Sequence, residues 1–318
     1  MKNKDNKIEF NPFLVFSNQL KVQLAAAKAS ENPALYLYQN GARNVIFMLE
    51  GLTRLHKEAF GSQKMEKWYD RFKVLEDLLG QFDYYDVLKT QFESEKMLDE
   101  QSLQILATKA TTALSAMNDV LATKNWFTKK LSKFDAFIAE ENYKYNEKYT
   151  TKLKTAYNAD VKEIVEFATE IKFKMKEVEN ELHELRRKLR WLSIYPQAMM
   201  GVFQLQKAQQ TPDWANKYMT ENVLNSPFNQ LEKTVEEIAI ISLDYHCFVA
   251  LSFVIQSFGE LKDKGLKSEL LATEFNFSAA KIKKILGANY VTTTNILAGG
   301  SALLATFFED KVLEQLVK

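Results

Sequence analysis

The chain has 318 residues, enough for one large domain or two modest ones. Its 10 glycines and 5 prolines are few for this length, and because turns need these residues, the composition favours long helices with few connections. The 42 Lys and Arg nearly cancel the 41 Asp and Glu, which argues against a dedicated nucleic-acid binder, since such proteins are usually far more basic. The single cysteine, Cys247, excludes an intrachain disulfide and fits a reducing compartment.

Proline and glycine positions divide the first half of the chain into helices. Pro12 and Pro33 bracket a first helix, and because no proline occurs between Pro33 and Pro196, nothing in that stretch forbids uninterrupted helix. Within residues 64–79, apolar residues recur at spacings of four, three and four, which is the period of a buried helix face. The pattern predicts helices over residues 34–60, 64–79, 84–92 and 102–122, and another from a cap at Asn125 to about residue 158.

The second half is predicted to begin with the longest helix of the chain, over residues 160–194. We expect a short apolar helix after Pro196 and then a looser segment, marked by Pro212 and Pro227.

Near the C-terminal end, Ser278 is expected to cap a helix, and a last helix is predicted over residues 293–318. The pair Gly299-Gly300 inside it usually allows close helix–helix approach or a kink. With no β-hairpin signal, the sequence predicts an all-α protein of long antiparallel helices. Its two helical halves would be residues 1–158 and 159–318.

The stretch Ile238–Phe258 is apolar and long enough to span a bilayer. Asp244 and His246 lie at its centre, however, and a central Asp costs about 2.5–3.5 kcal/mol on membrane insertion. The stretch therefore predicts a buried core helix and no membrane span. Charged residues of the same expected helix precede it, namely Glu232, Lys233, Glu236 and Glu237. The polar start, Met1–Pro12, lacks the apolar core of a signal peptide.

One face of the helix predicted over residues 160–194 gathers cations around a histidine. Residues three, four and seven positions after His183 lie within about 60° of it, because these offsets share one side of a helix. Two lysines fall on the same line upstream, and apolar residues fall on the opposite side. This basic face consists of Lys172, Lys176, His183, Arg186, Arg187 and Arg190.

Clustered cations of this kind point to an anionic ligand. Neighbouring like charges on a helix repel by a few tenths of a kcal/mol each, and a polyanion reverses that sign. Guanidinium groups match phosphate oxygens, and each charge-assisted hydrogen bond contributes about 1.5–3 kcal/mol. The alternative is a solvated face that Glu179, Glu181 and Glu184 partly neutralise.

The segment Leu182–Arg190 resembles a motif of the CHAD family, the conserved-histidine α-helical domains. In that family, a His is followed by Arg at +3, a basic residue at +4 and further basic residues near +7 to +10. Trp191 and Ser193 stand where more basic residues are usual, and Ile194 replaces an aromatic residue. The matching residues are His183, Arg186, Arg187 and Arg190.

The first half resembles the family's other motifs less closely. In Asn40–Arg43 the arginine matches, but Asn40 replaces the His. Downstream cations are replaced by Phe47, Met48 and Glu50. Leu78–Leu88 resembles the family's Leu-Gly…Arg-Asp-x-Asp-Val turn, with Asp83 where Arg is usual. Its matching residues are Gly80, Asp86 and Val87.

Other histidine, cysteine and lysine residues predict no second site. A helical di-iron site needs a Glu three residues before a His, and no histidine here has one. His56 is expected at the surface, His246 as a hydrogen-bonded core residue and Cys247 as an inert thiol. The lysines after Ser278 should face outward on a surface helix. Another basic cluster either lines the same groove as the basic face or is solvated: Lys129, Lys130 and Lys133.

The resemblance implies two four-helix bundles, related by a pseudo-two-fold axis, with a basic groove between them. It also implies binding of inorganic polyphosphate rather than catalysis, with Arg43 assisting the basic face. We therefore expect a cytoplasmic CHAD-like protein that binds polyphosphate or another phosphorylated polyanion, with no cofactor or metal and no nucleic-acid or membrane partner. The alternative is a helical scaffold or protein-interaction module that kept the fold and lost the ligand, which the near-zero net charge favours.

Overall fold

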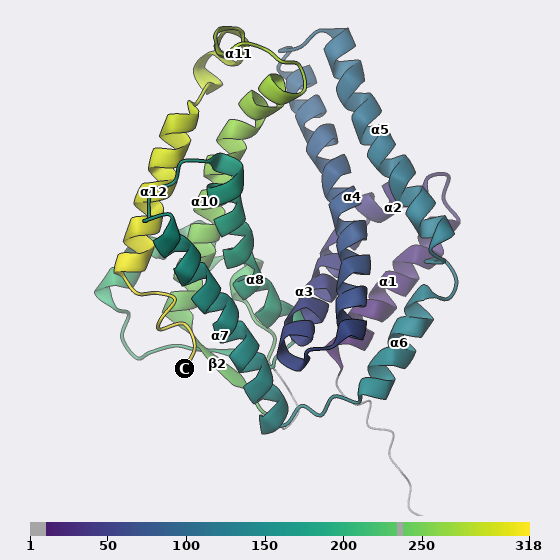
Figure 1. The fold of residues 1–318 in the computed structure, drawn as a ribbon, viewed down its shortest axis with the longest axis vertical. Coiled ribbons are helices and arrows are strands. Elements are labelled where there is room, and N and C mark those ends of the chain that lie inside the picture. The colour runs from purple at the N-terminus through teal and green to yellow at the C-terminus, as the bar shows by residue number, and fades with distance from the viewer. Residues whose placement is uncertain (1–10, 234–237) are drawn as a thin grey trace, which may run out of the picture.

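The computed structural model describes residues 11–233 and 238–318, and most of them are helical, as the composition predicts. Figure 1 shows the helices of the first half of the chain on one side of the molecule and those of the second half on the other. The first group comprises α1 (Pro12–Lys28), α2 (Pro33–Gln39), α3 (Ala42–Phe60), α4 (Gln63–Ser94), α5 (Glu100–Thr123) and α6 (Lys130–Glu141).

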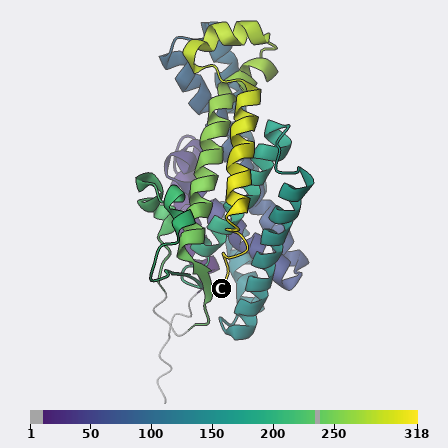
Figure 2. The same ribbon diagram turned by 90° about the vertical axis from the view of Figure 1, so that its left-hand side faces the viewer.

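The second group contains helices that are interrupted by turns and two short strands. Its helices are α7 (Glu147–Glu170), the π-helical turn η1 (Val178–His183), α8 (Glu184–Ala198), α9 (Glu221–Leu224), α10 (Tyr245–Thr273), α11 (Ala279–Leu286) and α12 (Thr293–Glu309). Three 3₁₀ turns join them: η2 (Asp213–Tyr218), η3 (Pro227–Asn229) and η4 (Gly287–Asn289). Figure 2 shows α10 and α12 running side by side along this half.

Polar caps fix where the helices begin. Asn11 and Asn32 accept hydrogen bonds from backbone N–H groups of the first turns of α1 and α2, and a proline follows each cap. Ser278 caps α11 as expected by accepting from the backbone N of Lys281, and the lysines of α11 are exposed. The expected cap at Asn125 is wrong, because Asn125 has a φ of 62° and α6 begins only at Lys130.

Two helix boundaries in the first half differ from the prediction. The helix expected over residues 34–60 is interrupted at Gly41, whose φ of 72° is left-handed. The helices expected over 64–79 and 84–92 form the single helix α4, which continues through Gly80. The turn that the family resemblance implies at Leu78–Leu88 is therefore absent, and these residues are helical.

The long helix predicted over residues 160–194 is wrong. The helix α7 runs from residue 147 to 170, so the expected boundary between the halves at residue 158 falls inside it. Lys172 and Phe173 then take left-handed φ values of 52° and 54°, and helix resumes only at η1. In this segment apolar residues alternate with lysines, and Met175 is buried while Lys172 is exposed. This period of two is typical of extended chain rather than helix.

The apolar stretch Ile238–Phe258 is buried or half-buried except at Ile240 and Gln256, as predicted for a core segment, but only part of it is helical. It begins outside any helix and continues as the strand β2 (Ile241–Asp244). Asp244 then caps α10 by accepting from the backbone N of Cys247 at 3.0 Å, and α10 continues past Gly259. Glu232 and Lys233 are not helical, and Glu236 and Glu237 lie outside the described residues.

No strand pairing is predicted from the sequence, yet β2 pairs in parallel with β1 (Phe203–Gln206). The register joins Phe203 to Ile241, and a bridge from Leu243 to Val317 ties the C-terminal end to the same strand. Four-residue strands carry too few alternating residues for their pattern to stand out from a loop.

Among the described residues, no single helix is long and apolar enough to cross a membrane. The pair Ala279–Asn289 and Thr293–Glu309, which is bent by 59°, meets the criteria of length and composition only when its two helices are taken together.

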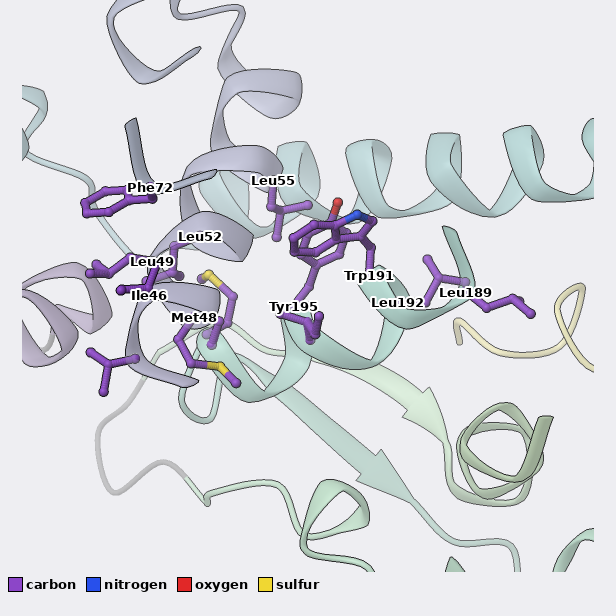
Figure 3. Close-up of a cluster of buried hydrophobic side chains, with 14 of the residues drawn as sticks. Ile46, Met48, Leu49, Leu52, Leu55, Phe72, Leu189, Trp191, Leu192 and Tyr195 are labelled. Atoms are coloured by element: carbon purple, nitrogen blue, oxygen red, sulfur yellow. The ribbon is translucent and has the colours of Figure 1, made fainter. Parts of the chain in front are cut away.

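The two halves meet through a main core and a smaller cluster. In the main core, α3 packs against α8, and Figure 3 shows Leu55 facing Trp191 and Tyr195. The smaller cluster joins the ends of α4 and α5 to α10 and α11. Its buried residues are Leu88, Phe92, Leu103, Leu106, Leu270, Leu271, Ile282 and Leu286. These two contacts leave the middle of the interface unfilled.

The pair Gly299-Gly300 allows close helix approach, which is one of the two roles expected for it. A Cβ at Gly300 would lie 2.8 Å from Met175 Sδ and 2.9 Å from Leu182 Cδ1. The chain just before α8 therefore packs directly on the backbone of α12.

Candidate functional site

A cavity of about 840 Å³ lies between α3 and α4 of the first half and α8 and α10 of the second. Eight of its lining residues are Lys or Arg and six are Asp or Glu. We call it the basic cavity. Five of the residues predicted to bind an anion line it: Arg43, His183, Arg186, Arg187 and Arg190. Lys172 and Lys176 are exposed and do not line it, because the backbone between them and His183 is not a continuous helix.

Arg43 lies in the basic cavity with its charge already neutralised. Its Nε donates to Glu76 Oε1 at 3.0 Å, and its Nη1 donates to Asp83 Oδ2 at 2.7 Å. Gly80 makes this position possible, since a Cβ there would lie 2.8 Å from Arg43 Nη2. Asp83 stands where the resembled motif has Arg. It therefore replaces one cation of the motif and neutralises another, Arg43.

Arg186 has a comparable position in the second half but no carboxylate partner among the described residues. Its guanidinium lies against Gly259 of α10, where a Cβ would be 3.1 Å from both Nε and Nη2. Nε donates to the backbone O of Ile255 at 3.2 Å. Burial lowers the pKa of Arg186, and Asp263 partly opposes this shift. The side chain stays cationic at neutral pH because an arginine pKa lies so high.

Arg190 has neither an ion pair nor a hydrogen bond with any part of the chain that the structure describes. Its guanidinium carbon lies 4.3 Å from the centre of the Phe47 ring, which is cation–π geometry. Burial and repulsion from Arg186 lower its pKa to about 10. A half-buried cation of this kind is costly in the free protein and attractive to an incoming anion.

His183 connects an acidic and a basic side chain. Its Nδ1 lies 2.6 Å from Glu179 Oε1, and its Nε2 lies 3.2 Å from Lys262 Nζ. An ammonium group only donates, so Nε2 accepts from Lys262 and the ring proton lies on Nδ1. In this geometry His183 positions Lys262.

Lys262 is the site residue that the sequence did not indicate. It is half-buried on α10, forms no ion pair within the described ranges, and burial lowers its pKa, with Arg186 acting in the same direction. Its only sequence signal is its position three residues after Gly259, which has meaning only once α8 and α10 are known to pack together. Arg186, Arg190 and Lys262 form what we call the three-cation cluster.

The other cations of the basic cavity have carboxylate partners. Arg187, which is exposed, pairs with Glu184 at 2.6 Å, and Lys73 pairs with Asp77 at 2.6 Å. Lys188 pairs with Glu163 and with Glu184. Arg54 pairs with Asp160 at 2.5 Å and with the hydroxyl of Tyr195.

Glu50 lines the basic cavity as a buried acid. It is 3% exposed, and its Oε2 has no hydrogen-bond partner among the described residues. Burial raises its pKa to about 8, and Glu76 adds to this shift. At neutral pH Glu50 is therefore mostly protonated, so it subtracts little from the positive charge of the cavity.

No group of three or more His, Cys, Asp and Glu within the described ranges has the arrangement of a metal site. His56 is fully buried rather than at the surface; it donates from Nδ1 to Leu52 O at 2.6 Å and accepts at Nε2 from the Tyr149 hydroxyl at 2.7 Å. His246 is buried as expected, but within the described part of the chain neither ring nitrogen has a hydrogen-bond partner. Burial raises the pKa of Cys247 to about 12, consistent with an unreactive thiol. Lys133 lines a separate small cavity between α4 and α6 and not the basic cavity.

Comparison with protein-family models, with curated proteins and with solved structures finds no match to this chain.

Proposed function

We propose that the basic cavity binds a phosphorylated anion, with inorganic polyphosphate as the simplest case, and that it does so without catalysis. The supporting observation is the three-cation cluster. Its three side chains line the basic cavity, and none of them forms an ion pair with a carboxylate in the described chain. Phosphate oxygens supply the missing counter-charge and accept hydrogen bonds from the two guanidinium groups. The cytoplasm is the proposed compartment, supported by the single free Cys247.

We also propose that the two halves are related bundles, as the CHAD resemblance implies. Support comes from the arginines at equivalent motif positions: Arg43 of α3 lies against Gly80 of α4, and Arg186 of α8 lies against Gly259 of α10. Helices α3, α4 and α5 pack consecutively in the first half, as α8, α10 and α12 do in the second. The halves would then differ in charge, because among the described residues only the first half supplies carboxylate partners for its arginine.

The alternative function is a scaffold that retains the fold without the ligand. Arg43 and Arg187 favour it, since internal carboxylates already satisfy them. The two functions differ in what the three-cation cluster does: in a scaffold its charges serve no ligand.

A charge-matched pair of variants tests the proposal. Tripolyphosphate is titrated into the wild type, into a variant with Arg186, Arg190 and Lys262 changed to Met, and into a control with Lys73, Arg187 and Lys188 changed to Met. Both variants lose three cations from the same cavity, but only the first loses unpaired ones.

We expect the first variant to lose about 100-fold in affinity, which corresponds to about 2.8 kcal/mol, and the control to lose less than ten-fold. Wild-type affinity should fall with salt at a logarithmic slope near −2, from about −0.7 for each of three neutralised phosphate charges. Equal losses in the two variants, or no binding by the wild type at low salt, would overturn the proposal.

A further inference from the structure

A second cavity, of about 750 Å³, adjoins the basic cavity and has a different chemistry. The two share three lining residues: Phe47, Arg186 and Arg190. Apart from the two arginines, no charged residue lines the second cavity within the described ranges; eight of its lining residues carry an amide or hydroxyl group and seven are apolar. We call it the amide-lined cavity.

The shared arginines stand where the two environments meet. Arg190 stacks on Phe47, and Arg186 is held by the backbone O of Ile255, which itself lines the amide-lined cavity. An anionic group bound by both guanidinium groups therefore has charged walls on one side and uncharged walls on the other. Inorganic polyphosphate is charged along its whole length and gains little from the uncharged side.

The uncharged side has the groups that recognise a base and a sugar. Asn44, Asn222 and Asn225 are exposed and make no side-chain hydrogen bond with the described residues, so their amides remain available to donate and accept. Phe228, at 54% exposure, presents an aromatic ring to the same space. Bases stack on aromatic rings of this kind, independently of base identity.

We infer that the physiological ligand is a nucleoside phosphate whose phosphate chain binds the three-cation cluster and whose nucleoside occupies the amide-lined cavity. This inference rests on the proposed function and narrows its ligand class. The geometry assigns Arg186 and Arg190, which line both cavities, to the phosphate nearest the sugar, and Lys262, which lines the basic cavity but not the amide-lined one, to the distal phosphates.

The test compares ligands that contain one part or both. Full-length protein is titrated by calorimetry, in magnesium-free buffer, with ATP, tripolyphosphate and adenosine. We expect ATP to bind at least ten-fold more tightly than tripolyphosphate, and adenosine to bind more weakly than either. Inositol hexakisphosphate serves as a densely charged ligand without a base.

Phe228→Ala isolates the contribution of the amide-lined cavity. Because this side chain is mostly exposed, its loss should leave folding intact, and Val74→Ala on the exposed face of α4 is the matched control. Phe228→Ala is expected to lower ATP affinity five-fold or more without changing tripolyphosphate affinity, while Val74→Ala changes neither. Arg190→Met should weaken both ligands.

The outcomes separate the two proposals. If neither ATP nor tripolyphosphate binds, the proposed function fails and the inference fails with it. If both bind equally and Phe228→Ala has no effect, or if inositol hexakisphosphate binds more tightly than ATP, the cavity is an anion site and the nucleoside assignment is overturned.

Discussion

Arg190 keeps a positive charge in a half-buried position, where it stacks on the Phe47 ring and has no ion-pair partner among the described residues. Burial lowers its pKa to about 10, so the folded state holds the proton less tightly than the unfolded state does. The destabilisation is therefore present at neutral pH, where the side chain is charged, and disappears only above the lowered pKa. Its position is thus unfavourable for stability and favourable for an anion.

Arg190→Met should stabilise the free protein, because methionine keeps much of the volume and removes the uncompensated charge. We expect a gain of about 1 kcal/mol, or roughly 2 °C in melting temperature. Tripolyphosphate at 100 times its Kd should stabilise the wild type by about 2.7 kcal/mol and the variant much less. Thermal unfolding with and without tripolyphosphate measures both effects. A variant that is less stable than wild type and equally protected would contradict this interpretation of Arg190.

Glu50 should make stability depend on pH between its unfolded and folded pKa values. Because burial raises its pKa from 4.5 to about 8, the folded state keeps a proton that the unfolded state loses across this range. Stability therefore falls as pH rises from about 4.5 to 8 and levels off above it. At pH 7 the loss is on the order of 3 kcal/mol. The charged groups that act on Glu50 are Glu76, Lys73, Asp77 and Arg190.

Glu50→Gln removes this dependence. The difference in unfolding free energy between Glu50→Gln and the wild type should grow with pH by about 3 kcal/mol up to pH 7 and by about 5 kcal/mol in all, and then stay constant above pH 8. Urea unfolding at a series of pH values measures it. If the difference stays constant from pH 4 to pH 9, Glu50 does not titrate as described.

The sequence predicts the anion-binding face only where its residues share one short helix. His183, Arg186, Arg187 and Arg190 do reach one cavity, since η1 and α8 keep their spacing. The sequence does not show which cations form ion pairs, because the carboxylates that neutralise Arg43 lie 33 and 40 positions away. Lys262 lies 79 positions from His183 and joins the site only through tertiary packing.

Glycines in the facing helices decide where the cavity arginines lie. Gly259→Ala adds a Cβ 3.1 Å from two atoms of the Arg186 guanidinium, which must then shift by a few tenths of an ångström from its place in the three-cation cluster. We expect tripolyphosphate affinity to fall about ten-fold, which corresponds to about 1.4 kcal/mol. Stability should be unchanged or rise by up to about 1 kcal/mol, because alanine favours helix over glycine.

Gly80→Ala in α4 is the matched control for Gly259→Ala. It displaces Arg43 in the same way, but Arg43 is already paired with Glu76 and Asp83. Affinity should change less than two-fold. Equal effects of the two substitutions would mean that pairing does not distinguish the two arginines. Binding titrations together with chemical unfolding separate the loss of affinity from a loss of fold.

Helix identity was predictable from periodicity, and helix ends were predictable where a side chain caps them, as at Ser278. The break after α7 was not predicted, although residues 171–176 alternate with a period of two. Gly80 misleads in the other direction. A glycine is a typical signal for the end of a helix, but α4 continues through Gly80, and Arg43 lies against it. Whether such a local signal ends a helix depends on the element that packs against it.

In the whole molecule, the basic cavity lies between the main core and the smaller cluster. The main core holds α3 against α8, and the smaller cluster closes the other end. Leu271→Ala empties a fully buried position of the smaller cluster and should cost about 2–5 kcal/mol. Because the cluster is separate from the main core, the loss should be local rather than global.

Hydrogen exchange measured by mass spectrometry would locate the effect of Leu271→Ala. Faster exchange is expected at the C-terminal end of α10, in α11 and at the adjoining ends of α4 and α5, with α3 and α8 unchanged. Leu192→Ala, in the main core, is the control and should accelerate exchange throughout. A uniform increase in Leu271→Ala would show that the molecule unfolds as one unit.

The connection between α8 and α10 has an evolutionary consequence. Helices α3 and α4 are joined by residues 61–62 alone, whereas residues 199–244 separate α8 from α10. On the proposed relation between the halves, the longer connection is an insertion into one copy of a duplicated gene. It carries Asn222, Asn225 and Phe228, which form one wall of the amide-lined cavity. Ligand selectivity in this lineage would then have been acquired after duplication, by a segment that its sister repeat never received.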